Sequence, residues 1–405
     1  MALVRAEVVF VAGRLVDGDE IRSHRSLAER LERLGFATRM ICSGAAPGYG
    51  IANLVEWPAL GRRWWLPWAA RGLADAVGFP FAPGRPTWLH VLGAHLADAG
   101  LDIAERWHVP YVLTVDEFPR RDARLRLSRA WCRGLIATNP ELAEALVRDY
   151  GVPPDFLWIV PRGIVEPELP RPASQPNRVP VVGAVGPLIP GSGFATFLNA
   201  ARRVVDLGFD AEFLLAGQGE GETDLRRRAE RLRLADRFTF VDDSTASLTF
   251  WDVMDVYCQT SVSPTAGRSL ALALAHGVPS IASDVEGLRF LVDGQEWGLR
   301  IPHGDPNLLA RAIVTLLEAP AAARRMSEAG RAAVLREHDP DREVARLVEF
   351  YERRSEAAPA GPQAPDAASR SGPTASDPSS GLSGMPLDRA AAVPTRPGTA
   401  FGPLA

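Results

Sequence analysis

The sequence contains no lysine: its 405 residues include 45 basic side chains, and every one of them is arginine. A chain without lysine cannot form a Schiff base with a substrate. It also has no ammonium group with which to bind a phosphate, so a cationic phosphate ligand would have to be arginine. The absence of lysine therefore excludes one group of covalent mechanisms and leaves arginine as the strong cation.

Cysteine and long apolar runs are also scarce. The three cysteines, Cys42, Cys132 and Cys258, are far apart and in apolar surroundings, so we expect buried thiols in a reducing cytoplasm and no metal site. No run of eighteen apolar residues occurs, and Arg5 and Glu7 interrupt the N-terminus, so we expect neither a membrane-spanning helix nor a signal peptide. A net charge of −4 gives no reason to expect nucleic acid as a partner.

What is present is a repeated alternation of short apolar strands and amphipathic helices, which predicts an α/β protein with parallel sheets. The alternation runs twice, interrupted by a proline-rich polar stretch that is typical of an interdomain linker. The segments that we predict are an N-terminal Rossmann-like domain over 1–165, a linker over 166–180, a C-terminal Rossmann-like domain over 181–338, a crossing helix over 339–354 and a disordered tail over 355–405.

The most informative stretch runs from Val253 to Gly304 and holds the spacing S-x5-G-x5-A-x-A-x-G-x-P, from Ser261 to Pro279. A G-x-G turn, Gly217 and Gly219, precedes it at the end of an apolar strand. In this combination the sequence resembles the family 4 glycosyltransferases of the GT-B fold. The resemblance implies two Rossmann-like domains facing a cleft, and transfer of a sugar from a nucleotide-diphospho-sugar with retention. No further cofactor is implied.

The same resemblance assigns site residues. It implies a catalytic carboxylate at Asp116, which stands where the family has a histidine, and an acceptor side at Gly13, Gly18 and His90. It implies a donor site made of Gly186, Gly191, Gly193, Gly217, Gly219, Ser261, Gly267 and Gly287, to which we add Arg268 and Arg289 as nearby cations for a phosphate.

Five positions that are charged in the family carry uncharged residues here. The family's arginine and lysine for the diphosphate are replaced by Pro187 and Ser192. Its glutamates are replaced by Pro264, Leu272 and Phe290. A hydrogen bond to a charged group contributes about 1.5–3 kcal/mol, so these losses weaken a conventional donor site strongly. Either the site has been rebuilt around Arg268, Arg289 or Arg162, or it has been dismantled.

A tryptophan-rich segment, Trp57–Trp68, lies between the predicted strands of the first domain. Tryptophan beside arginine suits a membrane interface, so peripheral attachment at the inner face of the membrane is one interpretation and packing against a protein partner is the other.

Two functions follow from these observations. The first is an active glycosyltransferase that uses a nucleotide-sugar and an unknown acceptor. The second is a catalytically degenerate relative that serves as a binding or scaffold protein in polysaccharide or glycoconjugate assembly.

Overall fold

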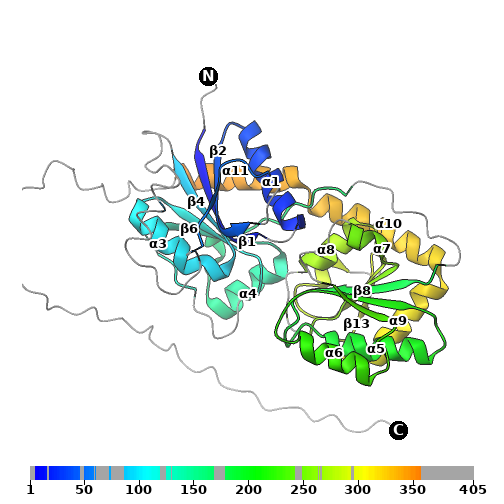
Figure 1. Ribbon diagram of the computed structural model, residues 1–405. Helices are drawn as coiled ribbons and strands as arrows, with labels where there is room; N and C mark the ends of the chain where they lie inside the picture. Colours follow the sequence, from blue (N-terminus) through cyan, green and yellow to red (C-terminus); the bar gives the residue numbers. More distant parts are fainter. Residues whose placement is uncertain are drawn as a thin grey trace, which may run out of the picture. The chain divides into compact units, whose positions relative to one another are not determined.

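Two parallel sheets organise the chain, one in each half of the sequence (Figure 1). The computed structural model describes residues 5–15, 18–45, 50–58, 60, 73, 86–118, 125–128, 130–167, 178–241, 249–262, 264, 267–292 and 296–356. The predicted tail, 355–405, therefore lies outside the described residues except for Ser355 and Glu356, which are helical. All described elements belong to one compact unit.

The first sheet has the order β3-β2-β1-β4-β5-β6-β7, and all of its pairings are parallel. Its strands are β1 Glu7–Leu15, β2 Ala37–Ala45, β3 Leu54–Glu56, β4 Thr87–Leu92, β5 Tyr111–Val115, β6 Cys132–Ala137 and β7 Leu157–Ile159. The helices of this half are α1 Gly18–Arg33, η1 Ala94–Leu96, α3 Ala97–Trp107, α4 Pro140–Tyr150 and η2 Pro154–Phe156.

The second sheet repeats this arrangement with the order β10-β9-β8-β11-β12-β13, again parallel throughout. Its strands are β8 Val181–Val185, β9 Glu212–Ala216, β10 Phe238–Val241, β11 Val256–Gln259, β12 Ser280–Ser283 and β13 Leu299–Ile301. Its helices are α5 Phe194–Asp206, α6 Glu222–Arg231, α7 Thr249–Val253, α8 Arg268–Ala275, η4 Arg289–Leu291, α9 Pro306–Glu318 and α10 Pro320–Glu337.

In both sheets the chain starts in the middle, runs to one edge and then returns to the other side. This order creates a switch point beside the first strand of each half, which is where open α/β sheets bind ligands. The two switch points lie at the carboxyl ends of β1 and β4 in the first half and of β8 and β11 in the second.

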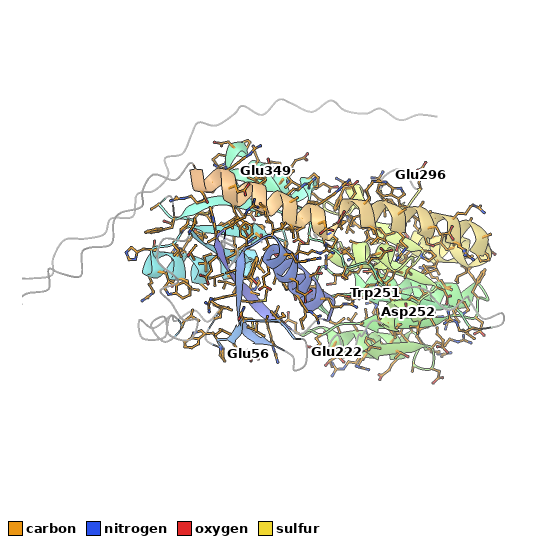
Figure 2. All side chains as sticks on the ribbon, turned by 90° about the horizontal axis from the view of Figure 1, so that it is seen from above. Glu56, Glu222, Trp251, Asp252, Glu296 and Glu349 are labelled. Carbon is orange, nitrogen blue, oxygen red and sulfur yellow. The ribbon has the colours of Figure 1, made fainter. Side chains whose placement is uncertain are left out.

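Helix α11, Pro340–Glu356, comes last in the described chain yet packs on the first sheet. Figure 2 shows α10 and α11 following one another from the second half to the first, with Glu349 labelled on α11. Four buried side chains of α11 enter a core cluster together with residues of β1, β2, β4 and α1; they are Val344, Leu347, Phe350 and Tyr351. Helix α11 thus adds to the core of the first half, and the division of the chain into domains stays a prediction.

The sequence and the structure differ at one element of the motif region. The apolar run from Val253 to Cys258 predicts a strand, but Val253 is the last residue of helix α7 and the strand begins at Val256. The reason is packing: Phe250, Trp251 and Met254 are buried in one core cluster, and a helical turn brings them onto one side of the chain. Pairing with β8 starts only at Val256.

Candidate functional site: a cleft between the two halves

A cleft of about 1450 Å³, including its open mouth, lies between the two halves. The first half lines it with Glu20 of α1, with residues 116–118 after β5 and with Arg162. The second half lines it with the loop after β8 and with the start of α8. Six of the site residues predicted from the sequence line this cleft: Asp116, Gly186, Gly191, Ser261, Gly267 and Arg268.

The wall formed by the second half contains the N-termini of two helices. Gly193 caps α5 and Gly267 caps α8, and neither helix receives a hydrogen bond from a capping side chain. Phe194 and Arg268, the first residues of these helices, line the cleft. Helix N-termini carry partial positive charge and backbone N–H groups, so this wall is suited to an anion.

Close approach of two loops explains why glycine is needed here. Gly193 has φ 76°, and a Cβ atom at this position would lie 1.6 Å from the carbonyl oxygen of Thr260. Gly217 and Gly219 do not line the cleft but support the loop from behind. A Cβ atom at Gly217 would lie 2.0 Å from the carbonyl oxygen of Gly186. These three glycines therefore shape the wall of the cleft.

Arg268 connects the two halves. Its Nη2 donates to Ser23 Oγ at 2.6 Å, and its Nη1 donates to the carbonyl oxygen of Gly163 at 3.4 Å. The guanidinium that the sequence places in the donor loop is thus directed toward the first half of the chain. Ser261, on the same wall, accepts a hydrogen bond from Gln259 Nε2 at 2.9 Å and is itself buried.

The wall formed by the first half is acidic, and one arginine lies within it. Arg162 Nη1 lies 3.5 Å from Asp116 Oδ2 and 3.9 Å from Glu20 Oε1. Its Nη2 lies 2.8 Å from His24 Nε2. Because guanidinium nitrogens only donate, His24 Nε2 accepts and this histidine is neutral. Burial, followed by the charge of Arg162, lowers the pKa of His24 well below its usual range.

Glu117 is the third carboxylate of this wall. Desolvation raises its pKa, and the neighbouring charge of Asp116 raises it further. A raised pKa marks a carboxylate that is short of compensating charge, which is typical of ligand-binding clefts.

The three residues predicted for the acceptor side lie elsewhere in the first half. His90 is buried, and its two ring nitrogens lie 2.6 Å from Tyr351 Oη and 2.7 Å from Thr114 Oγ1. Burial lowers its pKa to about 3, so it is a neutral core residue. Gly13 packs against the ring of His95, and Gly18 is the first residue of α1. None of the three is among the lining residues of the cleft.

Gly287 and Arg289 are also absent from the lining of the cleft. The backbone N–H of Gly287 donates to the carboxylate of Glu141, which also accepts from Phe290 N at 3.1 Å. Arg289 Nε donates to Asp284 Oδ1 at 2.6 Å on an exposed surface. The contact with Glu141 joins the two halves, and the arginine is held by its own loop.

Thr138 and His338 are among the lining residues that were not predicted from the sequence. Both are buried, and Thr138 Oγ1 and His338 Nε2 have no hydrogen-bond partner among the described residues. His338 Nδ1 lies 2.9 Å from the carbonyl oxygen of Arg162, so Nδ1 carries the proton and Nε2 is an acceptor. Thr138 follows β6 directly. Because open α/β sheets bind ligands at the carboxyl ends of their strands, the sequence could have indicated this residue. His338 follows the last residue of α10, and no pattern in the sequence indicates that it lines a cleft.

Part of the tryptophan-rich segment is described. Trp57 packs against the core of the first half, whereas Trp64, Trp65 and Trp68 lie outside the described residues. Within the described part of the chain, no helix is both long and apolar enough to cross a membrane. Membrane attachment through this segment remains a prediction, which co-sedimentation with anionic vesicles would test.

Comparison with known proteins agrees with this geometry. Residues 22–166 match the family model described as Glycosyltransferase Family 4, and residues 179–319 match the model described as Glycosyl transferases group 1. Among solved structures, sucrose-phosphate synthase from Thermosynechococcus elongatus superposes with a TM-score of 0.68 at 21% identity, over 87% of this chain and 100% of that one. Anabaena Alr3699/HepE in complex with UDP-glucose superposes with a TM-score of 0.69 at 16% identity, over 86% and 99%.

Curated relatives match over shorter lengths. Phosphatidyl-myo-inositol mannosyltransferase of Mycobacterium leprae is 31% identical over 164 residues, which are 40% of this chain and 43% of that protein. The 2-deoxystreptamine glucosyltransferase of Streptomyces kanamyceticus is 25% identical over 272 residues, 62% of this chain and 66% of that protein. The chain thus spans less than half of the first relative and about two thirds of the second.

The two facing Rossmann-like sheets and the cleft between them define a protein of the GT-B fold, as the sequence predicts. Within that fold, the chain belongs to the family 4, group 1 glycosyltransferases.

Proposed function

We propose that this protein transfers a sugar, with retention, from a nucleotide-diphospho-sugar bound in the cleft to a hydroxyl of an acceptor. The observation that carries the proposal is the convergence of two uncapped helix N-termini, those of α5 and α8, with the guanidinium of Arg268. Together they supply positive charge where the family's arginine and lysine are replaced by Pro187 and Ser192.

In this mechanism the diphosphate gains charge as its bond to the sugar breaks. Fixed donors and dipoles that point at the departing oxygen stabilise that charge without reorganising, which is usually the largest catalytic contribution. Arg268 would turn from Ser23 toward the diphosphate, a movement within reach of a long side chain. Asp116 would face the sugar, where a carboxylate can accept hydrogen bonds from its hydroxyls.

The comparisons support the donor class alone, and the acceptor class that we propose takes its starting point from the names of two relatives. Solved structures of Alr3699/HepE contain UDP, UDP with glucose, or UDP-glucose, so a nucleotide-diphospho-sugar is the donor class that we propose. Two curated relatives are named for cyclitol acceptors, phosphatidyl-myo-inositol and 2-deoxystreptamine. A polyol is therefore the acceptor class that we propose.

A second candidate function is a binding or scaffold protein without catalysis. It is favoured by the residues at the two glutamate positions of the family motif. Pro264 lines the cleft without a charge, and Leu272 is 6% exposed within a core cluster, where it cannot accept a hydrogen bond from a ribose.

The two candidates differ in nucleotide binding. We would measure binding of UDP, GDP and ADP, and of their sugars, to the full chain by calorimetry, and then repeat it with Arg268→Gln. The substitution removes the charge but retains an amide donor for Ser23, and we expect a loss of at least about 1.5 kcal/mol, roughly tenfold in affinity. Arg289→Gln is the matched control, since Arg289 pairs with Asp284 outside the cleft lining.

Binding of one nucleotide, with sensitivity to Arg268 alone, would support the transferase. No binding by any nucleotide at millimolar concentration would favour the second candidate. Equal effects of the two substitutions would contradict the role that we assign to Arg268.

A further inference from the structure

The cleft has an uneven distribution of charge. The wall from the first half presents three carboxylates, Glu20, Asp116 and Glu117, whereas Arg162 is the one cationic side chain that it contributes among the described lining residues. The wall from the second half contributes Arg268 and otherwise uncharged side chains around the loop after β8. An anionic donor therefore fits one wall, and the opposite wall repels anions.

The guanidinium of Arg162 already contacts several groups of this wall. It lies within 4 Å of Asp116 and of Glu20, and its other terminal nitrogen contacts His24. Its side chain is 17% exposed, so these contacts hold it in place. The described residues place no cation in ion-pair contact with Glu117, and of the groups that act on its pKa only His95 lowers it. Arg120 and Arg121, further along the chain, lie outside the described residues.

The N-terminus of α1, which also lies on this wall, carries acidic side chains. The first turn of α1 contains Asp19 and Glu20. Asp19 accepts a hydrogen bond from Trp251 Nε1 at 3.3 Å, a contact from the second half; Trp251 is labelled in Figure 2. A helix N-terminus ordinarily attracts a phosphate, but the carboxylates in the first turn of α1 offset that attraction.

Neutral polar groups complete the cleft. Thr138 is 8% exposed and His338 is 7% exposed, and each has one polar atom without a partner among the described residues. Buried polar atoms are rarely left without a partner, so these two atoms indicate a ligand with hydroxyl groups. Thr138 Oγ1 can donate or accept, and the neutral His338 ring accepts at Nε2.

We propose that the acceptor is an amine-bearing polyol, whose ammonium group is bound by Glu117 and whose hydroxyls reach Thr138 and His338. This inference rests on the proposed function and adds the charge of the acceptor to it. The ammonium group is not the nucleophile. A hydroxyl oxygen of the acceptor forms a bond to the anomeric carbon while the bond from that carbon to the diphosphate breaks, and the hydroxyl proton passes to the released diphosphate.

The experiment uses the full chain and four probes that differ mainly in charge. They are 2-deoxystreptamine, its N,N′-diacetyl derivative, myo-inositol and myo-inositol 1-phosphate. Affinity is measured by calorimetry at pH 7.0, with and without the nucleotide that binds best, and turnover is measured where it occurs. We expect 2-deoxystreptamine to bind at least about tenfold more tightly than its diacetyl derivative, because a charge-assisted hydrogen bond is lost on acetylation.

In Glu117→Gln, the ratio of the affinity for 2-deoxystreptamine to the affinity for its diacetyl derivative should fall toward one. Glu105→Gln is the matched control, because Glu105 is an exposed glutamate of the same half outside the cleft lining. A ratio that is unchanged in Glu117→Gln would overturn the assignment of the ammonium site.

Failure of this inference can be separated from failure of the proposed function. Nucleotide binding with no preference for the amine, or with a preference for the phosphate, overturns the inference and leaves the transferase intact. Amine binding that depends on Glu117 without any nucleotide binding supports the inference and removes the transferase. No binding of any probe or nucleotide overturns both.

Discussion

The two halves of the molecule share one strand order but build their cores differently. Each half has one apolar core cluster that is built only from its own residues, 9–152 in the first half and 182–323 in the second. The first half buries His24, His90 and Thr114 and receives Tyr351 and Phe350 from the far end of the chain. The same topology is therefore completed locally in one half and by a distant helix in the other.

This difference has a physical consequence. Both halves bury histidine, His24 and His90 in the first and His276 and His338 in the second, so a change in pH should affect both. The first half buries neutral histidines beside Arg162, and its packing depends on α11 remaining in place. Changes to α11 should therefore affect the first half first, and three predictions test how far the halves differ.

The largest effect should follow from Phe350→Ala. Phe350 is fully buried, and its ring centroid lies 5.8 Å from that of Trp88 and 5.4 Å from that of Trp158. Removal of a buried phenylalanine costs about 3–5 kcal/mol, and the cavity here would open between α11 and the first sheet. Amide hydrogen exchange should show that protection falls in β1, β4 and β6 while α5 and β9 keep theirs.

Leu207→Ala is the control, since Leu207 is 59% exposed and its truncation should change the free energy of unfolding by less than about 0.5 kcal/mol. Equal loss of protection in both sheets after Phe350→Ala would show that the halves unfold as one unit, and the contrast would then disappear.

A smaller effect should follow from acidification. Burial lowers the pKa of His90 to about 3 and, together with Arg268, that of His338 to about 4, against 6.5 in the unfolded chain. Below pH 6.5 these histidines bind protons in the unfolded state but not in the native state. The free energy of unfolding therefore falls as the pH decreases toward 4. Each such histidine contributes about 1.4 kcal/mol per pH unit in that window.

Glu343 opposes this trend in part, because burial raises its pKa and the native state then binds a proton more readily. We still expect a lower urea midpoint at pH 5 than at pH 7, with a flatter dependence in His338→Asn. His108→Asn is the matched control, since His108 is exposed and its positive φ of 56° suits asparagine. A midpoint that does not change between pH 7 and pH 5 would contradict the assignment of buried neutral histidines.

The smallest effect should follow from Glu141→Gln, which weakens a contact between the halves. Glu141 accepts hydrogen bonds from the backbone N–H groups of Gly287 and Phe290, and replacing the carboxylate by an amide should cost about 1 kcal/mol. Exchange of these two amides should accelerate, with little change in either core. Glu144→Gln, an exposed neighbour on α4, should leave their exchange unaltered; acceleration there too would point to fraying of α4.

The same contrast separates what could be predicted from what could not. The sequence predicts strands over 181–185 and 238–241, helices over 194–207 and 307–317, and a helix cap at Asn139. Strands β8 and β10 and helices α5 and α9 agree with these ranges to within one residue, because the hydrophobic period is a local signal. The short edge strands β3 and β13 have three residues each and carry too little pattern to be predicted. Asn139 caps α4 as expected, accepting from Leu142 N at 2.7 Å.

By itself, the sequence determined the GT-B architecture, the family and the loss of the family's charged donor residues. It did so because backbone periodicity and glycine spacing are encoded over short distances. Only the tertiary structure decided which charges meet. It buried His90 beneath α11, paired Arg289 with Asp284, turned Arg268 toward Ser23, and set Glu20, Asp116 and Glu117 on one wall. Electrostatic interactions act between atoms that are close in space, and spacing along the chain does not specify those distances.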